Sequence, residues 1–418
     1  MDIELVTIGT ELLLGLTVDT NGAEIARTLA AQGVRVTRRV SVADRPDEIR
    51  DAVSDALRRT GAVLTTGGLG PTRDDITKKV VADLFGAPLE FDQSVWANLL
   101  ERFARLERKP AESNRSQAEV PRGATVLRNR WGTAPGLWLE DSPGLVIMLP
   151  GVPLEMRRLL EHEVTPRLGA RATGSVIRSL TVRTTGVPES SLAERMGQIE
   201  REVAPLTLAY LPGLEGVDLR LSAWGMAAEE ADHRLRSAAD LLRGRAGESV
   251  YGEGDADLAA LVLGEARGRR LQLAVAESCT GGLLGGRLTD VPGSSEVFVG
   301  GVIAYADAVK SGLLEVPPAL IAEHGAVSEP VAKAMARGAA RRFGVEAALS
   351  ITGIAGPGGG SPTKPVGTVW IGCVLAGAVE TRRILFPGSR PEIRARAVQA
   401  ALFLLYRRLG VSEVILSS

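Results

Sequence analysis

The sequence predicts an α/β protein built in three parts. We expect a doubly wound sheet over residues 1–170, a small α+β domain with a linker over residues 171–252, and an α/β domain with a mixed sheet over residues 253–418. Short apolar runs alternate with amphipathic stretches at both ends of the chain, which is the pattern of buried strands covered by helices. At 418 residues the chain is also too long for one ordinary hydrophobic core.

The first part alternates between strand and helix patterns, which predicts a parallel sheet covered on both faces. Asn21 is the expected N-cap of the first long helix and Gly33 its expected stop, while Pro46 suits the first turn of the next helix. The expected elements are strand 3–9, helix 21–34, strand 34–44, helix 45–59, strand 61–68, a strand that ends near 149, and helix 153–163.

The middle part changes character and predicts a small α+β unit over residues 175–250. The sequence Gly-Leu-Glu-Gly at 213–216 matches the GxxG pattern of RNA-clamping modules. It lies between two strand patterns, however, so we interpret it as a hairpin turn. Residues 244–259 are rich in glycine and acidic residues, and they are the best linker candidate.

The last part predicts another α/β domain, in which two late strands are joined by a short turn at Ala376-Gly377. Strands joined so closely run antiparallel, so this sheet is expected to be mixed. The expected elements are helix 256–267, strand 271–277, helix 281–289, strand 298–305, helix 329–343, strand 346–352, strand 366–375, strand 380–386 and helix 391–408.

Composition excludes several classes of function. The formal net charge is −1 and aromatic residues make up 4% of the chain, which argues against direct binding of nucleic acid. The two cysteines, Cys279 and Cys373, leave no disulfide framework and fit a reducing compartment. The first residues do not form a signal peptide, and no apolar run reaches the roughly eighteen residues of a membrane span. We therefore expect a cytoplasmic protein without a membrane partner.

A glycine-rich loop at residues 65–79, TTGGLGPTRDDITKK, is the first candidate site. It follows a strand and leads into a helix, where unpaired N–H groups favour anions. Gly67, Gly68 and Gly70 let the backbone approach a phosphate closely, and Asp74 and Asp75 add carboxylates that a divalent ion could bridge to it. The alternative is a plain glycine turn whose acids stabilise the helix dipole.

Four motifs give this part a family resemblance: GTELLLG at 9–15, TGGLGPTRDD at 66–75, NRWGTAPG at 129–136 and LPGVPLEM at 149–156. They resemble the molybdopterin-binding-like half of the CinA family. The resemblance implies metal-dependent cleavage of the diphosphate of ADP-ribose. It implies that phosphate is held by Thr66, Gly67, Gly68 and Gly70, and that Asp44 and Asp75 are carboxylates of the pocket. The metal, whose identity stays open, is expected at Asp74 and Asp75. Glu11 and Asn21 are further candidates for the lining of the site.

The C-terminal part carries five motifs in order: AESCTGG at 276–282, VIAYADAVK at 302–310, GAVSEP at 325–330, ITGIAGPGGG at 351–360 and KPVGTVWIG at 364–372. Together they resemble the C-terminal CinA domain, a nicotinamide mononucleotide amidohydrolase. The resemblance implies hydrolysis of the carboxamide of nicotinamide mononucleotide to nicotinic acid mononucleotide and ammonia, in the salvage of pyridine nucleotides, without a cofactor.

Amide hydrolysis needs a nucleophile, a base and donors for the oxyanion. No histidine lies in a motif, so a Ser–His–Asp triad is disfavoured and a hydroxyl paired with a lysine is expected instead. We predict Ser278 as the nucleophile, Lys310 as the base and Tyr305 as a proton relay, with Thr280 and Cys279 as alternative nucleophiles. The alternative for Lys310 is an exposed helix lysine, but the resemblance favours the base.

Other residues of these motifs are expected to bind the substrate. Gly281 and Gly282 begin a helix, so their N–H groups could form an oxyanion hole or bind phosphate, and Glu277 is either a supporting acid or a charge at the helix start. Thr352 and Gly353 open the facing loop. Arg390 and Arg394 suit a 5′-phosphate, although they could also be a solvated face of the last helix.

The leading hypothesis is therefore a bifunctional, homodimeric enzyme of pyridine-nucleotide salvage that acts on nicotinamide mononucleotide and ADP-ribose. Two alternatives belong to other classes. One is a partner protein in DNA uptake or repair, which the competence name of the family suggests. The other is a molybdopterin-binding scaffold.

Overall fold

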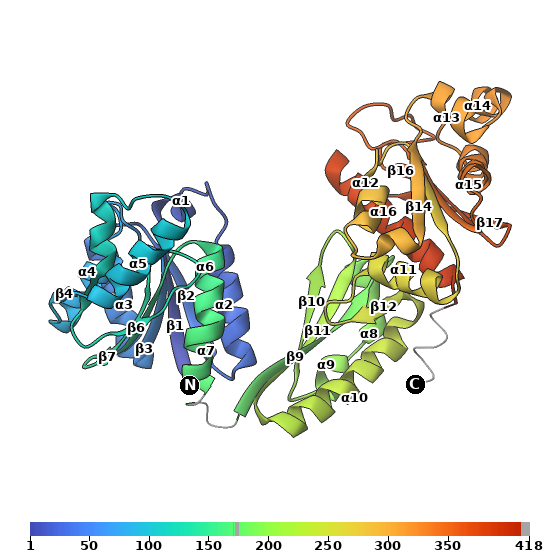
Figure 1. Cartoon of the computed structure of the whole chain (residues 1–418). Coiled ribbons are helices and arrows are strands. Elements are labelled where there is room, and N and C mark those ends of the chain that lie inside the picture. Colours follow the sequence, from blue (N-terminus) through green and yellow to red (C-terminus); the bar gives the residue numbers. More distant parts are fainter. Residues whose placement is uncertain (170, 172–174, 411–418) are drawn as a thin grey trace. The chain divides into compact units, whose positions relative to one another are not determined.

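The structure of the protein is a computed structural model that describes residues 1–169, 171 and 175–410 (Figure 1). The chain divides into two compact units. One contains residues 1–178 and 223–233, and the other contains residues 179–222 and 234–418. Each is described by itself. Within the described residues, no helix combines the length and the apolar character that a membrane crossing requires.

The first unit contains a six-stranded sheet in the order β2-β1-β3-β8-β7-β6. Strands β2, β1, β3 and β8 run parallel, as expected, whereas β7 is antiparallel to both β8 and β6. The expectation of a fully parallel sheet is therefore wrong at one edge, because a tight turn joins β7 directly to β8. The strands are β1 (Asp2–Ile8), β2 (Arg35–Val42), β3 (Ala62–Thr66), β6 (Thr125–Leu127), β7 (Gly136–Asp141) and β8 (Gly144–Leu149).

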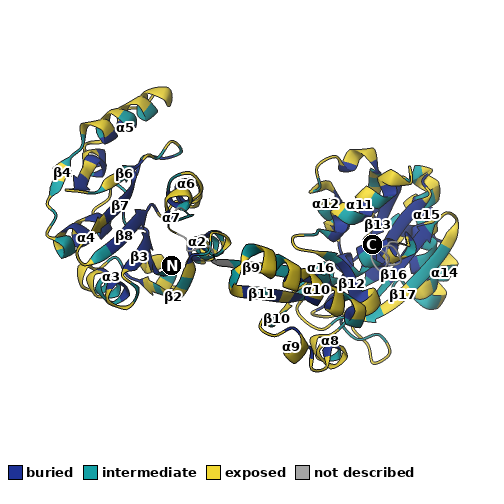
Figure 2. Cartoon of the chain, turned by 90° about the horizontal axis from the view of Figure 1, so that it is seen from below, coloured by how far each residue is buried: buried dark blue, intermediate teal, exposed yellow. Residues whose placement is uncertain are grey.

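Helices cover this sheet on both faces, and each face has its own hydrophobic cluster, with buried strands between exposed helix surfaces (Figure 2). The N-cap of α2 is Asp19, whose side chain accepts from the N–H of Gly22, so the expected cap, Asn21, is wrong by two residues. The remaining elements are α1 (Thr10–Leu13), α2 (Thr20–Ala31), α3 (Pro46–Thr60), α4 (Thr77–Phe85), β4 (Leu89–Phe91), α5 (Gln93–Arg105), η1 (Glu112–Ala118), β5 (Glu119–Pro121), α6 (Pro153–Leu159), η2 (Leu160–Val164) and α7 (Thr165–Gly169).

The middle of the chain forms a four-stranded sheet in the order β10-β11-β9-β12. The GxxG sequence is the hairpin turn between β10 and β11, as predicted, since Pro212 pairs with Val217 and the N–H of Gly213 donates to the carbonyl of Gly216 at 2.8 Å. The elements are β9 (Ser175–Thr184), α8 (Glu189–Met196), α9 (Ile199–Glu202), β10 (Thr207–Pro212), β11 (Val217–Ala227), α10 (Ala228–Ala246), η3 (Gly247–Ser249) and β12 (Val250–Glu253).

The expected linker at residues 244–259 is wrong for most of its length. Strand β12 pairs with β9, and Tyr251 within it is only 1% exposed. The hydroxyl of Tyr406 donates to the carbonyl of Tyr251 at 3.0 Å, which ties β12 to the last helix of the chain. The free energy gained by burying the ring of Tyr251 outweighs the flexibility that its glycine-rich neighbours would otherwise give this segment.

The C-terminal domain is built on a five-stranded mixed sheet in the order β14-β13-β15-β16-β17. Strands β14, β13 and β15 are parallel, and β16 and β17 are antiparallel to their neighbours, as the short turn at Ala376-Gly377 predicted. The strands are β13 (Leu273–Glu277), β14 (Phe298–Ile303), β15 (Ala347–Gly353), β16 (Thr368–Leu375) and β17 (Ala378–Leu385).

Two hydrophobic clusters cover the two faces of this sheet. Helices α11, α12 and α16 contribute to one cluster, and α13, α14 and α15 pack against the other. The pair α13 and α14 was not predicted. The helices are α11 (Leu258–Gly268), α12 (Leu283–Thr289), η4 (Ser294–Glu296), α13 (Asp307–Leu314), α14 (Pro318–His324), α15 (Glu329–Phe343) and α16 (Arg390–Arg408).

Candidate active sites at the strand ends

The first candidate site lies where parallel strands β2, β1, β3 and β8 end. Binding sites of open α/β sheets form at this edge, because loops from neighbouring strands diverge there. The strand ends bring together Gly9, Asp44, the loop 66–70 and Gly151, and the start of α2 joins them. The amide nitrogen of Asn21 donates to the carbonyl of Gly151 at 2.7 Å and to Oγ1 of Thr66 at 3.3 Å.

The glycine loop after β3 cannot carry side chains at its centre. Gly67 and Gly68 have φ of 111° and 68°, a region that favours glycine. A Cβ at Gly67 would lie 2.2 Å from the carbonyl oxygen of Ile8, and one at Gly68 would lie 2.1 Å from Oγ1 of Thr77. The loop therefore packs tightly against β1 and the first turn of α4, which fixes the direction of its N–H groups.

Three N–H groups of this loop have no protein acceptor in the part of the chain that the structure describes: those of Gly68, Leu69 and Gly70. By contrast, the N–H of Gly67 donates to the carbonyl of Leu149 at 3.0 Å. Free N–H groups on a rigid loop before a helix form an anion-binding concavity. This geometry fits the expected phosphate role of the loop.

The carboxylates beside the loop are engaged with the backbone. Asp44 accepts from the N–H and the hydroxyl of Thr10, at 2.8 and 3.0 Å, and Asp75 accepts from the N–H of Thr72 at 2.8 Å. Asp74 is exposed. Among the described residues there is no group of three acidic, histidine or cysteine side chains that could hold a metal ion alone.

Asn21, expected as a cap, lies in this site instead. Its Oδ1 is buried and has no hydrogen-bond donor in the described part of the protein. Buried acceptors are normally paired, so this oxygen marks a place where a ligand N–H or O–H could bind. Glu11 is exposed at the start of α1, as the plain helix-acid interpretation expects.

The motifs at 129–136 and 149–156 meet beside the sheet. The amide of Asn129 donates to Glu155 at 2.6 Å, and a Cβ at Gly132 would lie 1.7 Å from the carboxylate of Glu155. Burial raises the pKa of Glu155, against the opposing effect of Asn129. These motif residues therefore support one another, and their contacts are structural rather than directed at a ligand.

The second candidate site lies at the ends of β14, β13 and β15. The N–H of Ser278 donates to the carbonyl of Ile351 at 2.9 Å, and the N–H of Ala304 donates to the carbonyl of Glu277 at 2.7 Å. These bonds continue the parallel register, so Ser278 and Tyr305 follow β13 and β14, and Thr352 lies near the end of the adjacent β15, at one edge of the sheet. Ser278 is buried, at 8% exposure, and no hydrogen bond of its Oγ is found within the described residues.

Lys310 is one of the most buried large side chains in the protein, at 1% exposure, which excludes the exposed-lysine interpretation. Its Nζ donates to the carbonyl of Tyr305 and to Oδ1 of Asp307, both at 3.1 Å. The first bond anchors the amine at the end of β14, the strand next to the one that leads into Ser278. The ion pair with Asp307 was missed, although its spacing of three residues on a helix was a signal.

Glu277 occupies the start of α12, which corrects the expected role of the glycines. Its carboxylate accepts from the N–H groups of Gly282, Leu284 and Gly285 at 3.1, 3.0 and 2.8 Å, and the N–H of Gly281 donates to the carbonyl of Ser278 at 3.1 Å. The N–H groups of Gly281 and Gly282 therefore cannot serve as free donors for an oxyanion or a phosphate in this arrangement. Glu277 is the helix-start charge that the alternative interpretation expected.

Arg390 and Arg394 extend from the first turns of α16 toward the motif loops. Arg390 donates to the carbonyl of Gly356 at 2.6 Å and to the hydroxyl of Tyr305 at 3.2 Å, whereas Arg394 donates to the carbonyl of Thr280 at 2.6 Å. The Nε of Arg394 is buried and has no acceptor among the described residues. Arg390 is exposed and Arg394 is half-buried, and the spare donors of both suit an anion.

The other hydroxyls and the thiol are less suited to attack. Thr352 is 1% exposed and donates to the carbonyl of Ala326 at 2.9 Å, while Thr280 is fully buried with an unpaired Oγ1. Burial raises the pKa of Cys279 to about 11, so its thiolate is scarce at neutral pH. Gly353 ends β15, and a Cβ there would lie 2.7 Å from Val369, so its role is close packing.

Comparison with known protein families divides the chain as follows. The model described as "Probable molybdopterin binding domain" matches residues 4–170. The model described as "Damage-inducible protein CinA KH domain" matches residues 179–252, and the model described as "CinA C-terminal domain" matches residues 255–409.

Individual relatives match over almost the whole length. A "CinA-like protein" of Gemmatimonas aurantiaca is 56% identical over 411 residues, 97% of this chain and 96% of the relative. A "CinA-like protein" of Chlorobaculum tepidum is 43% identical over 419 residues, 98% of this chain and 99% of the relative. Among solved structures, the competence damage-inducible protein A of Klebsiella pneumoniae matches with 35% sequence identity and a TM-score of 0.36. The match covers 37% of this chain and 95% of the chain in that crystal structure.

Proposed function

Because the chain belongs to the CinA family, as its identity to full-length relatives shows, we propose that its C-terminal domain hydrolyses the carboxamide of nicotinamide mononucleotide. The products would be nicotinic acid mononucleotide and ammonia. The reaction needs no cofactor, because a hydroxyl nucleophile and a base are enough to hydrolyse an amide.

The arginines of α16 would hold the 5′-phosphate of the substrate. Arg394 has a buried Nε without an acceptor, and Arg390 also touches Tyr305, so a phosphate bound there would lie beside the motif loops. Guanidinium groups bind phosphate through paired N–H donors. The pyridine ring would then reach the end of β13, with its carboxamide at Ser278.

Ser278 would attack the carboxamide carbon while Lys310 takes the proton from its Oγ. The C–N bond breaks, the leaving nitrogen receives that proton, and ammonia departs from an acyl-serine ester. Water then hydrolyses the ester to the acid and restores the serine. Lys310 must be neutral to accept a proton, so Asp307, whose side chain is 59% exposed, would turn to water when substrate binds.

The observation that carries this proposal is the burial of Lys310. Its Nζ binds the carbonyl of Tyr305 just after β14, the strand next to the one that leads into Ser278. A lysine is rarely buried without a function or a full set of partners. Here one of its two partners, Asp307, lies largely in solvent. An amine in such a place is suited to act as a base.

The test is ammonia release from nicotinamide mononucleotide. We expect Ser278→Ala to lower kcat by at least roughly 10²-fold, the effect of removing a central catalytic group. Ser237→Ala, a change of an exposed serine on α10, is the matched control and should leave the rate unchanged. Full activity of Ser278→Ala would overturn the assignment of the nucleophile, and no activity in the wild type would overturn the proposed substrate.

A second activity is supported by the open N–H groups of Gly68, Leu69 and Gly70. We propose that the first site cleaves the diphosphate of ADP-ribose with a divalent metal held by Asp74 and Asp75 together with the substrate. Such an ion would neutralise charge that develops on the diphosphate. The chain itself would hold the phosphates through the loop, and Oδ1 of Asn21 would accept from the sugar or base.

A chelator should separate the two activities. We expect EDTA to reduce AMP release from ADP-ribose by at least roughly 10²-fold, because removal of the metal takes away several kcal/mol of charge stabilisation. Ammonia release should stay unchanged. Added Mg²⁺ should restore AMP release. Persistence of AMP release in EDTA would contradict the metal, and pterin fluorescence that co-purifies with the protein would favour a molybdopterin-binding role of this domain instead.

A further inference from the structure

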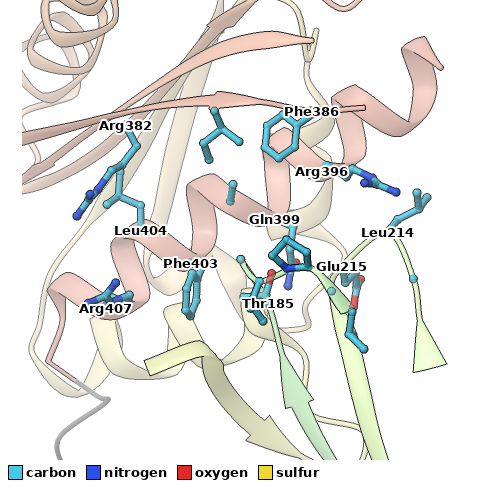
Figure 3. Close-up of a pocket in the computed structure, with 18 of the residues that line it drawn as sticks. Thr185, Leu214, Glu215, Arg382, Phe386, Arg396, Gln399, Phe403, Leu404 and Arg407 are labelled. Carbon is cyan, nitrogen blue, oxygen red and sulfur yellow. The ribbon is translucent and has the colours of Figure 1, made fainter. Parts of the chain in front are cut away.

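A cavity of about 730 Å³ lies in the second unit, and its lining includes none of the residues placed in the candidate active site of that unit (Figure 3). Its walls are the loop 185–189, the hairpin 212–217, strand β17 with the residues that follow it, and the second half of α16. Cavities of this size hold small organic ligands. The proposed amidase and diphosphatase reactions use none of these residues.

Two buried donors on α16 line this cavity without a partner. Gln399 is 4% exposed, and its Nε2 has no acceptor among the residues that the structure describes. The same is true of Nε of Arg396. Residues three apart share one face of a helix, so both donors serve the same space. Figure 3 shows the amide of Gln399 pointing from α16 toward Thr185. Unpaired buried donors are costly, so their presence calls for an acceptor from outside the chain.

Most charges that line the cavity form ion pairs. Arg382 and Arg407 pair with Glu380 and Glu248 at 2.7 and 2.5 Å, and Arg408 lies 3.8 Å from Glu380. Arg396 is held less closely: its nearby charge is that of Glu392, one helical turn earlier, whose pKa is lowered first by hydrogen bonds from Ser389 and then by Arg396. On the acidic side, Glu215 pairs with Arg183 and Arg287 at 2.7 and 2.8 Å. Glu189 lies in the first turn of α8, where the helix dipole stabilises a carboxylate.

Aromatic side chains form the apolar part of the lining. Phe386 follows β17 and Phe403 belongs to α16, and both line the cavity. In the view of Figure 3, Arg396 extends toward Leu214 of the hairpin. Flat apolar walls favour a planar ring, while the unpaired donors of Gln399 and Arg396 favour an anionic acceptor.

The GxxG hairpin is held rigidly as a wall of this space. A Cβ at Gly216 would lie 1.9 Å from the carbonyl oxygen of Thr184, and Oγ1 of Thr184 donates to the carbonyl of Val217 at 2.6 Å. The hairpin is also tied to α12 through the pair of Glu215 with Arg287. A cavity with fixed walls does not have to be ordered by its ligand, which favours binding.

From these observations we propose that the cavity binds an aromatic anion, which is a planar ring that carries a phosphate or a carboxylate. The anionic group would accept from Gln399 Nε2 and from the guanidinium of Arg396. The ring would lie against Phe386 and Phe403. This site is independent of the proposed reactions, because it needs neither Ser278 nor the 66–70 loop.

Hydrogen–deuterium exchange of the full chain tests the proposal, with AMP, benzoate and inorganic phosphate as separate probes. We expect AMP or benzoate to slow exchange in the peptides that cover 185–189, 212–217 and 396–408. Protection by both shows a general aromatic-anion site, protection by AMP alone shows a nucleotide site, and protection by benzoate alone shows a carboxylate site. Protection confined to residues 66–75, or equal protection by phosphate alone, would overturn the proposal, as would no protection by any probe.

Variants of the two donors give the matched comparison. We expect Gln399→Leu and Arg396→Met each to weaken the protecting ligand about tenfold or more, as expected when a charged hydrogen bond is lost. Gln93→Leu, a change of an exposed glutamine on α5, should have no effect. Unchanged exchange of β13 and β15 without ligand shows that a variant is folded. Wild-type affinity in both folded variants would exclude this cavity as the binding site.

Discussion

In the first domain the glycine loop after β3 leaves the N–H groups of Gly68, Leu69 and Gly70 without a protein acceptor, within the described residues. In the C-terminal domain the N–H groups of Gly281 and Gly282, in the loop after β13, donate to the carbonyl of Ser278 and the carboxylate of Glu277. Those of Cys279 and Thr280 have no protein acceptor within the described residues. Both loops follow a central parallel strand and both lead into a helix. The glycine N–H groups at this position are therefore open to an anion in the first domain and occupied in the C-terminal domain.

This difference shows that a glycine-rich loop at a strand end does not by itself define a phosphate site. An internal carboxylate can take the place of the ligand. In the C-terminal domain we propose that Arg390 and Arg394, which come from the far end of the sequence, bind the phosphate instead. The two sites therefore require different experiments, one that addresses the backbone and metal and one that addresses side chains.

The largest expected effect is that of replacing Lys310. We expect Lys310→Met to lower kcat for ammonia release by roughly 10²- to 10⁴-fold, the range for loss of general acid–base catalysis. Lys310→Arg should be nearly as inactive, because a guanidinium does not give up its proton at ordinary pH. AMP release from ADP-ribose in the same samples should be unchanged. Normal turnover by Lys310→Arg would show that Lys310 contributes only its positive charge and not a proton transfer. The contrast between a side-chain base in this site and backbone N–H groups in the first site would then be lost.

A smaller effect is expected at the arginines. Arg394→Met should raise KM for nicotinamide mononucleotide about 10- to 100-fold with little change in kcat, because a charged hydrogen bond to phosphate is lost in the ground state and the transition state alike. Steady-state ammonia release measures both constants. Arg341→Met, which removes a surface ion pair with Glu315, is the matched control. An unchanged KM would mean that the phosphate binds elsewhere.

The smallest effect concerns the pH dependence of stability in the first domain. Burial lowers the pKa of Lys78 to about 8, whereas the unfolded chain has the ordinary value of 10.5. Between these values the unfolded state holds more protons, so stability rises with pH. We expect the free energy of unfolding to rise by roughly 1 kcal/mol between about pH 7.5 and 9.

Tryptophan fluorescence in urea can follow this change, since Trp96, Trp131 and Trp138 lie in the first domain. Lys78→Met should remove the rise, and Lys79→Met, a change of its exposed neighbour, should keep it. The same slope in both variants would mean that other groups cause it. No comparable effect is expected in ammonia release, because Lys78 belongs to the other domain.

Much of this architecture follows from local sequence patterns. Apolar runs that end in glycine and hydroxyl residues predicted both strand ends, and the turn at Ala376-Gly377 predicted the mixed sheet, because these features depend on a few neighbouring residues. The burial of Tyr251 could not be predicted, because it depends on β9 and Tyr406, which lie far along the chain. The antiparallel edge of the first sheet was missed although a short turn joins β7 to β8.

The residues of the candidate sites also divide into those that local sequence patterns predict and those that only the packing shows. Ser278, Thr352 and Tyr305 could be predicted at one edge of the sheet, because each lies at the end of a parallel strand. The sequence left open whether Glu277 supports the site or stabilises the helix start, and only the packing of the loop shows that it binds the N–H groups of Gly282, Leu284 and Gly285. The pairing of Lys310 with Asp307 was visible as a helical spacing, yet that spacing is too common to identify a site.

The position of Glu277 also has a consequence for product release. In the proposed reaction a neutral carboxamide becomes a carboxylate at the residue that follows Glu277 in the chain. Two negative charges that are close together in a site of low polarity repel each other. The acid would therefore leave more readily than the amide that preceded it, and the same repulsion would oppose the reverse reaction and weaken inhibition by accumulated product.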